Sequence, residues 1–358
     1  MATLENPRSL PTFEVPPEAA AALWQGQRGW RASDLTPSDW TLVMPNDLGR
    51  DIMTLATADG PLDAVVGRWV PGPVSAAFQA QVEAMLEGGV GFCLIRGFAL
   101  PADDRAVERA ALLVGLLLGR PVSQTKKGNI LARVEDLGQD LKTPTVRGHQ
   151  TAAELAFHCD RADRVLLLCV RTAQSGGRSR IVSSIALAEA LRAEAGESAK
   201  RLYRPLPQDR RGEEAPGERP FSTMPVFSER DGVFVARYLR RFIQDSQRHP
   251  DAPRLSVEDE ATLDRLDALI ERDGMALEMP FKPGDIQILN NNVVLHARTA
   301  FEDYAEPELR RLLLRVWLSH ASARPLPDSF SDLYGSTKAG SHRGGVWPDG
   351  RSPAALAI

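Results

Sequence analysis

The sequence contains only three cysteines in 358 residues. Cys93, Cys159 and Cys169 form no Cys-x-x-Cys pair, so a disulfide framework and the usual thiolate metal motifs are excluded. Long hydrophobic runs are also missing, because the longest one, Ala110–Gly119, has about half of the ~20 residues that a membrane span needs. The N-terminus has no apolar core and carries Glu5 early, so we expect no signal peptide. These absences favour a globular protein of the cytoplasm.

Charge of one sign is not in excess either. The chain has 43 Lys and Arg against 47 Asp and Glu, a net charge of −4 and a pI near 6.0, so it lacks the basic footprint of a nucleic-acid binder. No Gly-x-Gly-x-x-Gly or Walker-type loop follows a predicted strand, which excludes the common dinucleotide and P-loop folds. We expect a small-molecule partner, no nucleic acid and no membrane, and homo-oligomerisation is left open.

The chain divides into three stretches of different character. Residues 1–74 are rich in Pro and Trp with only short apolar pieces, so we expect an irregular extension packed on the core. Residues 75–330 alternate between helical periodicity and short apolar runs, and we predict a single main domain there. Residues 331–358 are polar and rich in glycine near Ser336, so we expect a flexible tail that closes over the functional site as a flap.

Short strands joined by tight turns dominate the last third of the main domain. Pro283–Asp285 and Asn290–Asn292 read as turns between the apolar runs that surround them. Tight turns of this kind indicate antiparallel hairpins. We therefore predict a mainly β or α+β fold, a sandwich or barrel with α-helices packed outside it.

Two of the six histidines lie where a metal site would need them. His158 and Asp160 are two residues apart on a predicted strand, so both side chains leave the same face. His296 lies far downstream on another predicted strand. Two imidazoles and one carboxylate hold Fe(II) while leaving coordination positions open. A hydrogen-bonded His–Asp pair and a core histidine are the alternative interpretations of the same residues.

A pair of arginines on the last strand adds an anion-binding element. On a strand, Arg311, Leu313, Arg315 and Trp317 share one face, and two cations on an apolar face are costly to bury without anions. A dicarboxylate such as 2-oxoglutarate would supply one partner, since a guanidinium binds a carboxylate through two hydrogen bonds. The two arginine backbones lie about 13 Å apart on an extended strand, which predicts different roles. The acidic residues upstream are alternative partners, namely Glu302, Asp303, Glu306 and Glu308.

These motifs together resemble the TauD/TfdA family of Fe(II)- and 2-oxoglutarate-dependent dioxygenases, including its clavaminate synthase-like branch. The matching segments are GFCLIRGF at 91–98, FHCDRADRVLLLCVRTAQSGGRS at 157–179, and FKPGDIQILNNNVVLHARTAFEDY with RRLLLRVWL at 281–318. The resemblance implies a distorted double-stranded β-helix (jelly roll) with flanking α-helices over 75–330. It also implies that His158, Asp160 and His296 bind iron, that Arg311 holds the distal carboxylate of 2-oxoglutarate, and that Ser179 and Arg315 contact the co-substrate.

The function that this resemblance implies is an oxygenase using Fe(II), 2-oxoglutarate and O₂. It would hydroxylate, desaturate or cyclise an unactivated C–H of a small, anionic or amino-acid-like metabolite, in secondary metabolism or catabolism, releasing succinate and CO₂. The related halogenases lack the carboxylate ligand, and Asp160 retains it here. A metal-dependent hydrolase with the same ligands and a catalytically inactive jelly-roll binding protein are alternatives.

The substrate side of the site is the least specified by sequence. Gln124, Asn129, Arg237 and Arg298 are the candidate substrate contacts, and Arg298 has an alternative role as the ion-pair partner of Asp303. Residues 124–150 and the tail from residue 336 are the two candidate lids.

Overall fold

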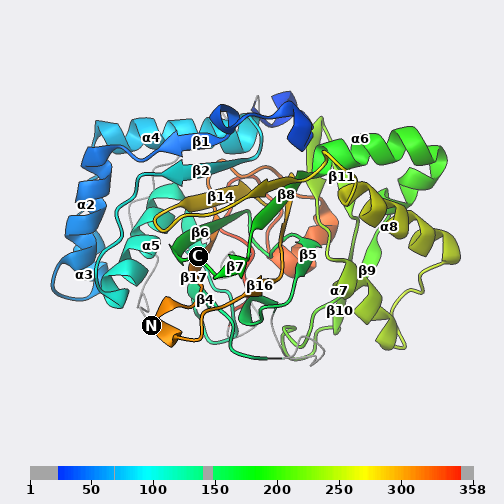
Figure 1. Ribbon diagram of the computed structural model, residues 1–358. Helices are drawn as coiled ribbons and strands as arrows, with labels where there is room; N and C mark the ends of the chain where they lie inside the picture. Colours follow the sequence, from blue (N-terminus) through cyan, green and yellow to red (C-terminus); the bar gives the residue numbers. More distant parts are fainter. Residues whose placement is uncertain (1–22, 68, 140–147, 348–358) are drawn as a thin grey trace.

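The computed structural model describes residues 23–67, 69–139 and 148–347, and its elements form four layers (Figure 1). Two β-sheets lie at the centre, with α2–α5 on one side and α6 and α8 on the other. The helices are α2 (Asn46–Thr57), α3 (Leu62–Val66), α4 (Pro73–Glu83), α5 (Asp104–Leu118), α6 (Ser184–Ala195), α7 (Arg240–Asp245), α8 (Val257–Ile270) and α9 (Ser331–Tyr334).

The larger sheet has seven strands in the order β1-β2-β14-β6-β17-β3, and β4 also pairs with β17. Strand β1 runs parallel to β2, whereas the other pairs are antiparallel. Its central strands are mostly apolar and buried along their length, as expected for strands covered on both faces. The strands are β1 (Thr41–Val43), β2 (Phe92–Arg96), β3 (Arg120–Val122), β4 (Leu131–Val134), β6 (Arg164–Arg171), β14 (Ile286–Asn290) and β17 (Leu312–Ser319).

The smaller sheet brings two distant parts of the chain together. Its order is β13-β8-β15-β5, all antiparallel, from β5 (Leu155–His158), β8 (Ser179–Ser183), β13 (Leu277–Met279) and β15 (Val294–Arg298). His296 on β15 lies directly opposite His158 on β5. Two-stranded pairs complete the described strands: β7 (Ser175–Gly176) with β16 (Phe301–Glu302), β9 (Leu206–Asp209) with β10 (Phe221–Met224), and β11 (Phe227–Arg230) with β12 (Val233–Ala236).

Three apolar clusters separate the layers. One lies between the sheets and joins Ile181 and Val294 of the smaller sheet to Leu94 and Trp317 of the larger one. A second packs α2, α4 and α5 on the outer face of the larger sheet, and a third packs α6 and α8 on the smaller. Helix α5 is capped by Asp103, whose carboxylate accepts a hydrogen bond from the backbone N–H of Ala106. The sheets are therefore sandwiched face to face, and a site between them is protected on both sides.

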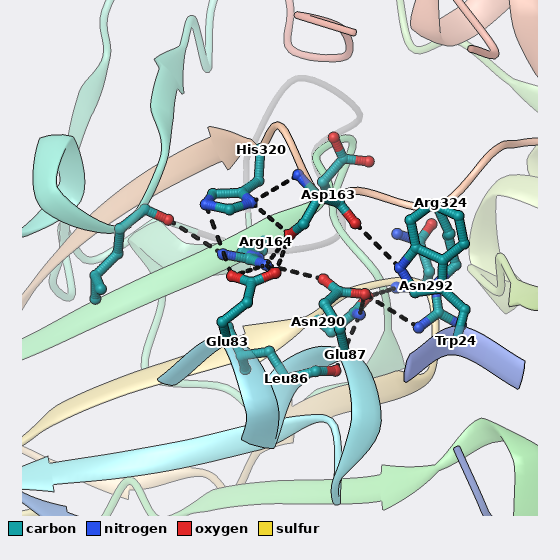
Figure 2. Close-up of polar contacts among 12 residues, drawn as sticks. Trp24, Glu83, Leu86, Glu87, Asp163, Arg164, Asn290, Asn292, His320 and Arg324 are labelled. Atoms are coloured by element: carbon teal, nitrogen blue, oxygen red, sulfur yellow. Dashed lines mark hydrogen bonds and ion pairs between the residues drawn. The ribbon is translucent and has the colours of Figure 1, made fainter. Parts of the chain in front are cut away.

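A buried ionic network connects the helical layer to the start of β6 (Figure 2). The Arg164 guanidinium donates to Glu83 and Glu87, with N–O distances of 2.8 and 2.9 Å, and its side chain is 1% exposed. Glu87 also accepts from Asn290 and Arg324. Buried charges are tolerated when they are paired and hydrogen-bonded. The network therefore fixes the beginning of β6, and Asp160 lies only a few residues before this point.

Two expectations from the sequence need correction. The segment before residue 75 is not irregular throughout, because it contains α2, α3 and the edge strand β1, and it contributes Leu48 and Ile52 to the core. The tail is not a free flap over its described part, since Arg343 is buried and ion-paired with Asp163 at 2.7 Å. Residues 348–358 of the tail lie outside the described residues. No helix among the described residues is both long and apolar enough to cross a membrane.

Candidate active site

Three predicted ligands converge at the inner face of the smaller sheet. One ligand atom from each of His158, Asp160 and His296 lies within 4.8 Å of the others. The Nε2 atom of His158 is 3.9 Å from Oδ1 of Asp160, and Nε2 of His296 is 3.7 Å from Oδ2. The imidazole rings, from paired strands, have centroids 4.3 Å apart. Donor atoms gathered at this spacing around one point can share a single metal ion.

Both imidazoles turn their Nε2 atoms toward the carboxylate of Asp160. The Nδ1 of His158 lies 2.8 Å from the carbonyl oxygen of Ala156, which can only accept, so Nδ1 carries the proton. Burial, and to a smaller extent the neighbouring His158, lowers the pKa of His296 to about 3, so the ring stays neutral. A neutral imidazole oriented through its other nitrogen is the form that binds metals.

The carboxylate of Asp160 is held from two directions. Its Oδ2 accepts hydrogen bonds from Nη1 of Arg315 at 3.2 Å and Nε1 of Trp317 at 2.8 Å, both on β17 of the opposite sheet. Burial by itself would raise the pKa of Asp160, but the charges of Arg315 and the two histidines hold that pKa well below its ordinary range. Asp160 is therefore ionised, as a metal ligand must be.

The backbone of Asp160 is fixed as firmly as its side chain. The Asn291 amide accepts from the Asp160 N–H at 3.2 Å and donates to the carbonyls of Asp160 and Ala162, both at 3.0 Å. Nη1 of Arg237 also donates to the carbonyl of Asp160, at 3.3 Å, and to the Tyr334 hydroxyl. Arg237 is thus a support for the predicted ligand, beneath the site, and it does not line the two cavities described next.

A small inner cavity of about 50 Å³ adjoins the two histidines and ends at Arg311. The Arg311 side chain is buried and packs on the Phe301 ring with its Cζ 5.0 Å from the centroid, and its Nη1 has no hydrogen-bond partner among the residues that the structure describes. Burial lowers the pKa of Arg311 to about 10. Ser179 also lines the cavity, where its hydroxyl bonds to Gln287. A buried, incompletely bonded guanidinium is an anion site, and the cavity fits a carboxylate.

Arg298 also lines the inner cavity, beside Arg311. It donates to the backbone carbonyls of Thr151 and Ala153, and burial, followed by the charge of Arg311, lowers its pKa to about 9. The predicted partner Asp303 instead accepts from the backbone N–H of Arg311. The structure therefore places Arg298 at the wall of the inner cavity, beside Arg311.

A larger outer cavity of about 290 Å³ lies on the other side of the predicted ligands. His158, Leu155 and Arg315 line both cavities, whereas Asp160 and Trp317 line only the outer one. The cationic residues of the outer wall are Arg211, Arg240 and Arg241. The predicted metal point is thus the junction between an inner and an outer chamber.

The remaining predicted substrate residues lie behind the cavity walls. Gln124 holds Arg315 from both ends, accepting from its Nε at 2.8 Å and donating to its carbonyl at 2.9 Å. Asn129 bonds to Thr125 and is not a lining residue of either cavity. The lid candidate 124–150 falls partly outside the described residues. Sequence reasoning missed Asn291, which it assigned only to a turn, and the arginines of the outer wall, which look like ordinary surface charge.

A centre of two histidines and one carboxylate, between facing sheets and beside an anion pocket, is the arrangement of non-haem iron oxygenases. Comparison with protein families agrees: the family described as "Taurine catabolism dioxygenase TauD, TfdA family" matches residues 60–317. The chain belongs to this family, and it is a dioxygenase that depends on Fe(II) and 2-oxoglutarate. The match begins before residue 75, in keeping with the helices found there.

Individual relatives extend the comparison. FR-33289 synthase of Streptomyces rubellomurinus is 29% identical over 88% of this chain and 94% of its own length. Uridine-5'-phosphate dioxygenase of an Amycolatopsis species is 29% identical over 64% of this chain and 86% of its own.

A solved asparagine oxygenase, in complex with Fe(II), 3-hydroxyasparagine and succinate, aligns with a TM-score of 0.60 at 18% identity. The alignment covers 84% of this chain and 99% of that one. The solved non-haem iron oxygenase OrfP aligns with a TM-score of 0.56 at 15% identity, over 78% and 94% of the two chains. At this identity the solved structures establish a shared fold.

Proposed function

We propose that this protein oxidises an unactivated C–H bond of a small anionic or amino-acid-like metabolite, with His158, Asp160 and His296 as the iron ligands. The observation that carries this proposal is the convergence of three metal-competent donor atoms at the junction of two cavities, one of which ends at a buried guanidinium. Its core is proposed to be a distorted double-stranded β-helix. Three buried free cysteines are in keeping with a reducing, cytoplasmic compartment.

Each chamber has a proposed occupant. The inner cavity takes 2-oxoglutarate, whose distal carboxylate is held by Arg311 with Arg298 beside it, while Ser179 contributes a hydroxyl to the same wall. The outer cavity takes the substrate. Arg315 lines both chambers, and its hydrogen bond to Oδ2 of Asp160 holds the carboxylate ligand in place.

The side chains prepare the site for chemistry that they cannot supply. When bound, iron and 2-oxoglutarate provide the activation of O₂, with decarboxylation of the co-substrate to succinate and CO₂. The protein keeps the His296 imidazole neutral, keeps Asp160 ionised, and covers the site with Trp317 and the apolar residues between the sheets. A dry, preorganised site of this kind protects reactive species from water.

The cationic outer wall supports an anionic substrate. Uridine-5'-phosphate dioxygenase, one of the relatives, is named for a phosphate ester, whereas the solved asparagine oxygenase and OrfP carry hydroxylated amino acids. An anionic group is common to these molecules. Hydroxylation is the proposed reaction, with desaturation and cyclisation as variants.

Anaerobic titration of the apo-protein with Fe(II) and 2-oxoglutarate tests the proposal through the visible metal-to-ligand charge-transfer band. We expect the band in the wild type, its loss in His158→Ala and in His296→Ala, and a weaker co-substrate affinity in Arg311→Ala. Arg272→Gln, which breaks an exposed ion pair with Glu194 and lines neither cavity, is the control and should match the wild type. Absence of the band from folded, iron-loaded wild type would overturn the oxygenase assignment.

A further inference from the structure

A third cavity, of about 60 Å³, lies next to the predicted carboxylate ligand and is lined in part by residues of β9 and β10. We call it the rear cavity. Its wall has four residues in common with the wall of the outer cavity, namely Asp160, Leu239, Phe242 and Trp317. The two cavities therefore adjoin. Leu239 forms an isolated antiparallel bridge with His158, so the shared wall is fixed to the end of β5.

The pair of strands β9 and β10 presents a buried carboxamide to the rear cavity. Gln208 on β9 lies directly opposite Ser222 on β10, both line the cavity, and each is 1% exposed. Neither Oε1 nor Nε2 of Gln208 has a hydrogen-bond partner among the residues that the structure describes. Interchanging these two atoms leaves a donor and an acceptor unmet in either orientation. Because a buried polar group without a partner destabilises the folded state, Gln208 indicates a ligand in this cavity.

Arginines of the rear cavity add further unmet donors. The Nε atoms of Arg161 and Arg237 are buried and have no hydrogen-bond partner within the described part of the chain. Burial lowers the pKa of Arg161 to about 10, although the charge of Glu213 acts in the opposite direction. Arg161 is therefore still charged at neutral pH. Among the described residues of this wall, the unmet donors outnumber the unmet acceptors.

The charges of the wall do not favour an anion as the ligand. The wall carries as many carboxylates as guanidinium groups: Asp160, Asp209 and Glu213 against Arg161, Arg210 and Arg237. An unprotonated oxyanion also offers no N–H or O–H group to Oε1 of Gln208. An amide meets both requirements, because its carbonyl accepts from Nε2 of Gln208 or from a guanidinium and its N–H donates to Oε1.

We propose that the rear cavity binds an amide group of the substrate, a carboxamide or a secondary amide, through the side chain of Gln208. Arg161 and Arg237 are further donors to its carbonyl oxygen. This inference rests on the proposed function and deepens it, because it names a chemical group that the substrate carries. Since the rear and outer cavities adjoin at Asp160, an amide bound in the rear cavity leaves the rest of the substrate in the outer cavity, beside the predicted metal ligands.

The test measures the binding of three small ligands to the protein loaded with Fe(II) and 2-oxoglutarate, by anaerobic titration calorimetry. Butyramide has a carbonyl and N–H groups, 2-pentanone has the carbonyl alone, and butyrate has a negative charge. We expect the wild type to bind butyramide about tenfold more tightly than 2-pentanone, because only the amide satisfies both ends of Gln208. Gln208→Leu should weaken butyramide binding about tenfold and leave the affinity for butyrate unchanged.

A control variant and a parallel spectrum separate the possible outcomes. Gln81→Leu makes the same substitution at an exposed position of α4 that lines none of the three cavities, and it should match the wild type. Absence of the charge-transfer band from the wild type means that the proposed function has failed.

With a normal charge-transfer band, three results overturn the amide subsite. The first is no butyramide binding, which means that water alone fills the rear cavity. The second is equal wild-type affinity for butyramide and 2-pentanone, a comparison that decides the matter even where Gln208→Leu fails to fold. The third is a folded Gln208→Leu variant in which butyramide affinity is unchanged, or in which butyrate affinity falls as much as butyramide affinity.

Discussion

Substitution of Asn291 tests whether this residue contributes to metal binding as well as to the free energy of unfolding. Its side chain makes three hydrogen bonds, to the N–H and carbonyl of Asp160 and to the carbonyl of Ala162. Asn291→Ala removes all three at a site where the residue is 2% exposed. At roughly 1 kcal/mol for each buried bond, the free energy of unfolding should fall by about 3 kcal/mol. Because the lost bonds orient the backbone of the predicted carboxylate ligand, Fe(II) affinity should also fall, by about 10- to 100-fold.

The neighbouring Asn290 is a matched control in the same turn. It also makes three hydrogen bonds, to the carbonyl of Leu86, to Glu87 and from the N–H of Asn292, but none to Asp160. Asn290→Ala should therefore lose a similar amount of stability while keeping wild-type affinity for the metal. Urea unfolding measures the first quantity, and anaerobic Fe(II) titration at saturating 2-oxoglutarate measures the second. Equal metal affinities in the two variants would refute the positioning role of Asn291.

Three further predictions address the anion pocket, the buried ionic network and the tail. Gly177→Ala should raise the KM for 2-oxoglutarate by about tenfold, since a Cβ there would lie 2.9 Å from Nε of Arg311; Gly196→Ala, also at positive φ but with open space around it, should leave this KM unchanged. Arg164→Met should cost about 3 to 5 kcal/mol in urea unfolding, because it leaves the buried Glu83 without its cation and takes one of two cations from Glu87; a loss below about 1 kcal/mol would contradict this reasoning. Burial, and then a nearby arginine, lowers the pKa of His342 from 6.5 to about 4 in the folded protein, so the unfolded chain binds more protons in that window and stability should fall as the pH drops from 6.5 to 4. His342→Gln should reduce the fall in thermal-unfolding temperature over this pH range. An unchanged pH dependence in this variant would contradict the lowered pKa of His342 in the folded protein.

The motifs taken together, more than local spacing, predicted the metal cluster. His158 ends β5 and Asp160 follows outside the strand, so the two ligands come together through the segment after β5 and not through a shared strand face. Arg311, immediately before β17, and Arg315, on β17, both line the inner cavity and have different neighbours. Apolar periodicity predicted the alternation of helices and short strands after residue 75, whereas β1 is too short to be recognised and takes its identity from pairing with β2.

The sequence by itself determined the class of chemistry, because the types of a few side chains, in the motifs that surround them, specify which donor atoms are available to a metal. Tertiary structure decided which residues surround those atoms. Arg298 lines the inner cavity because it lies on β15. Arg237 and Gln124 instead support the site through hydrogen bonds to Asp160 and to Arg315. Arg211 and Arg241 meet at Asp245 only because separate segments pack against β5. Such contacts depend on how segments distant in the sequence pack together, and the local periodicity of a sequence carries no information about that packing.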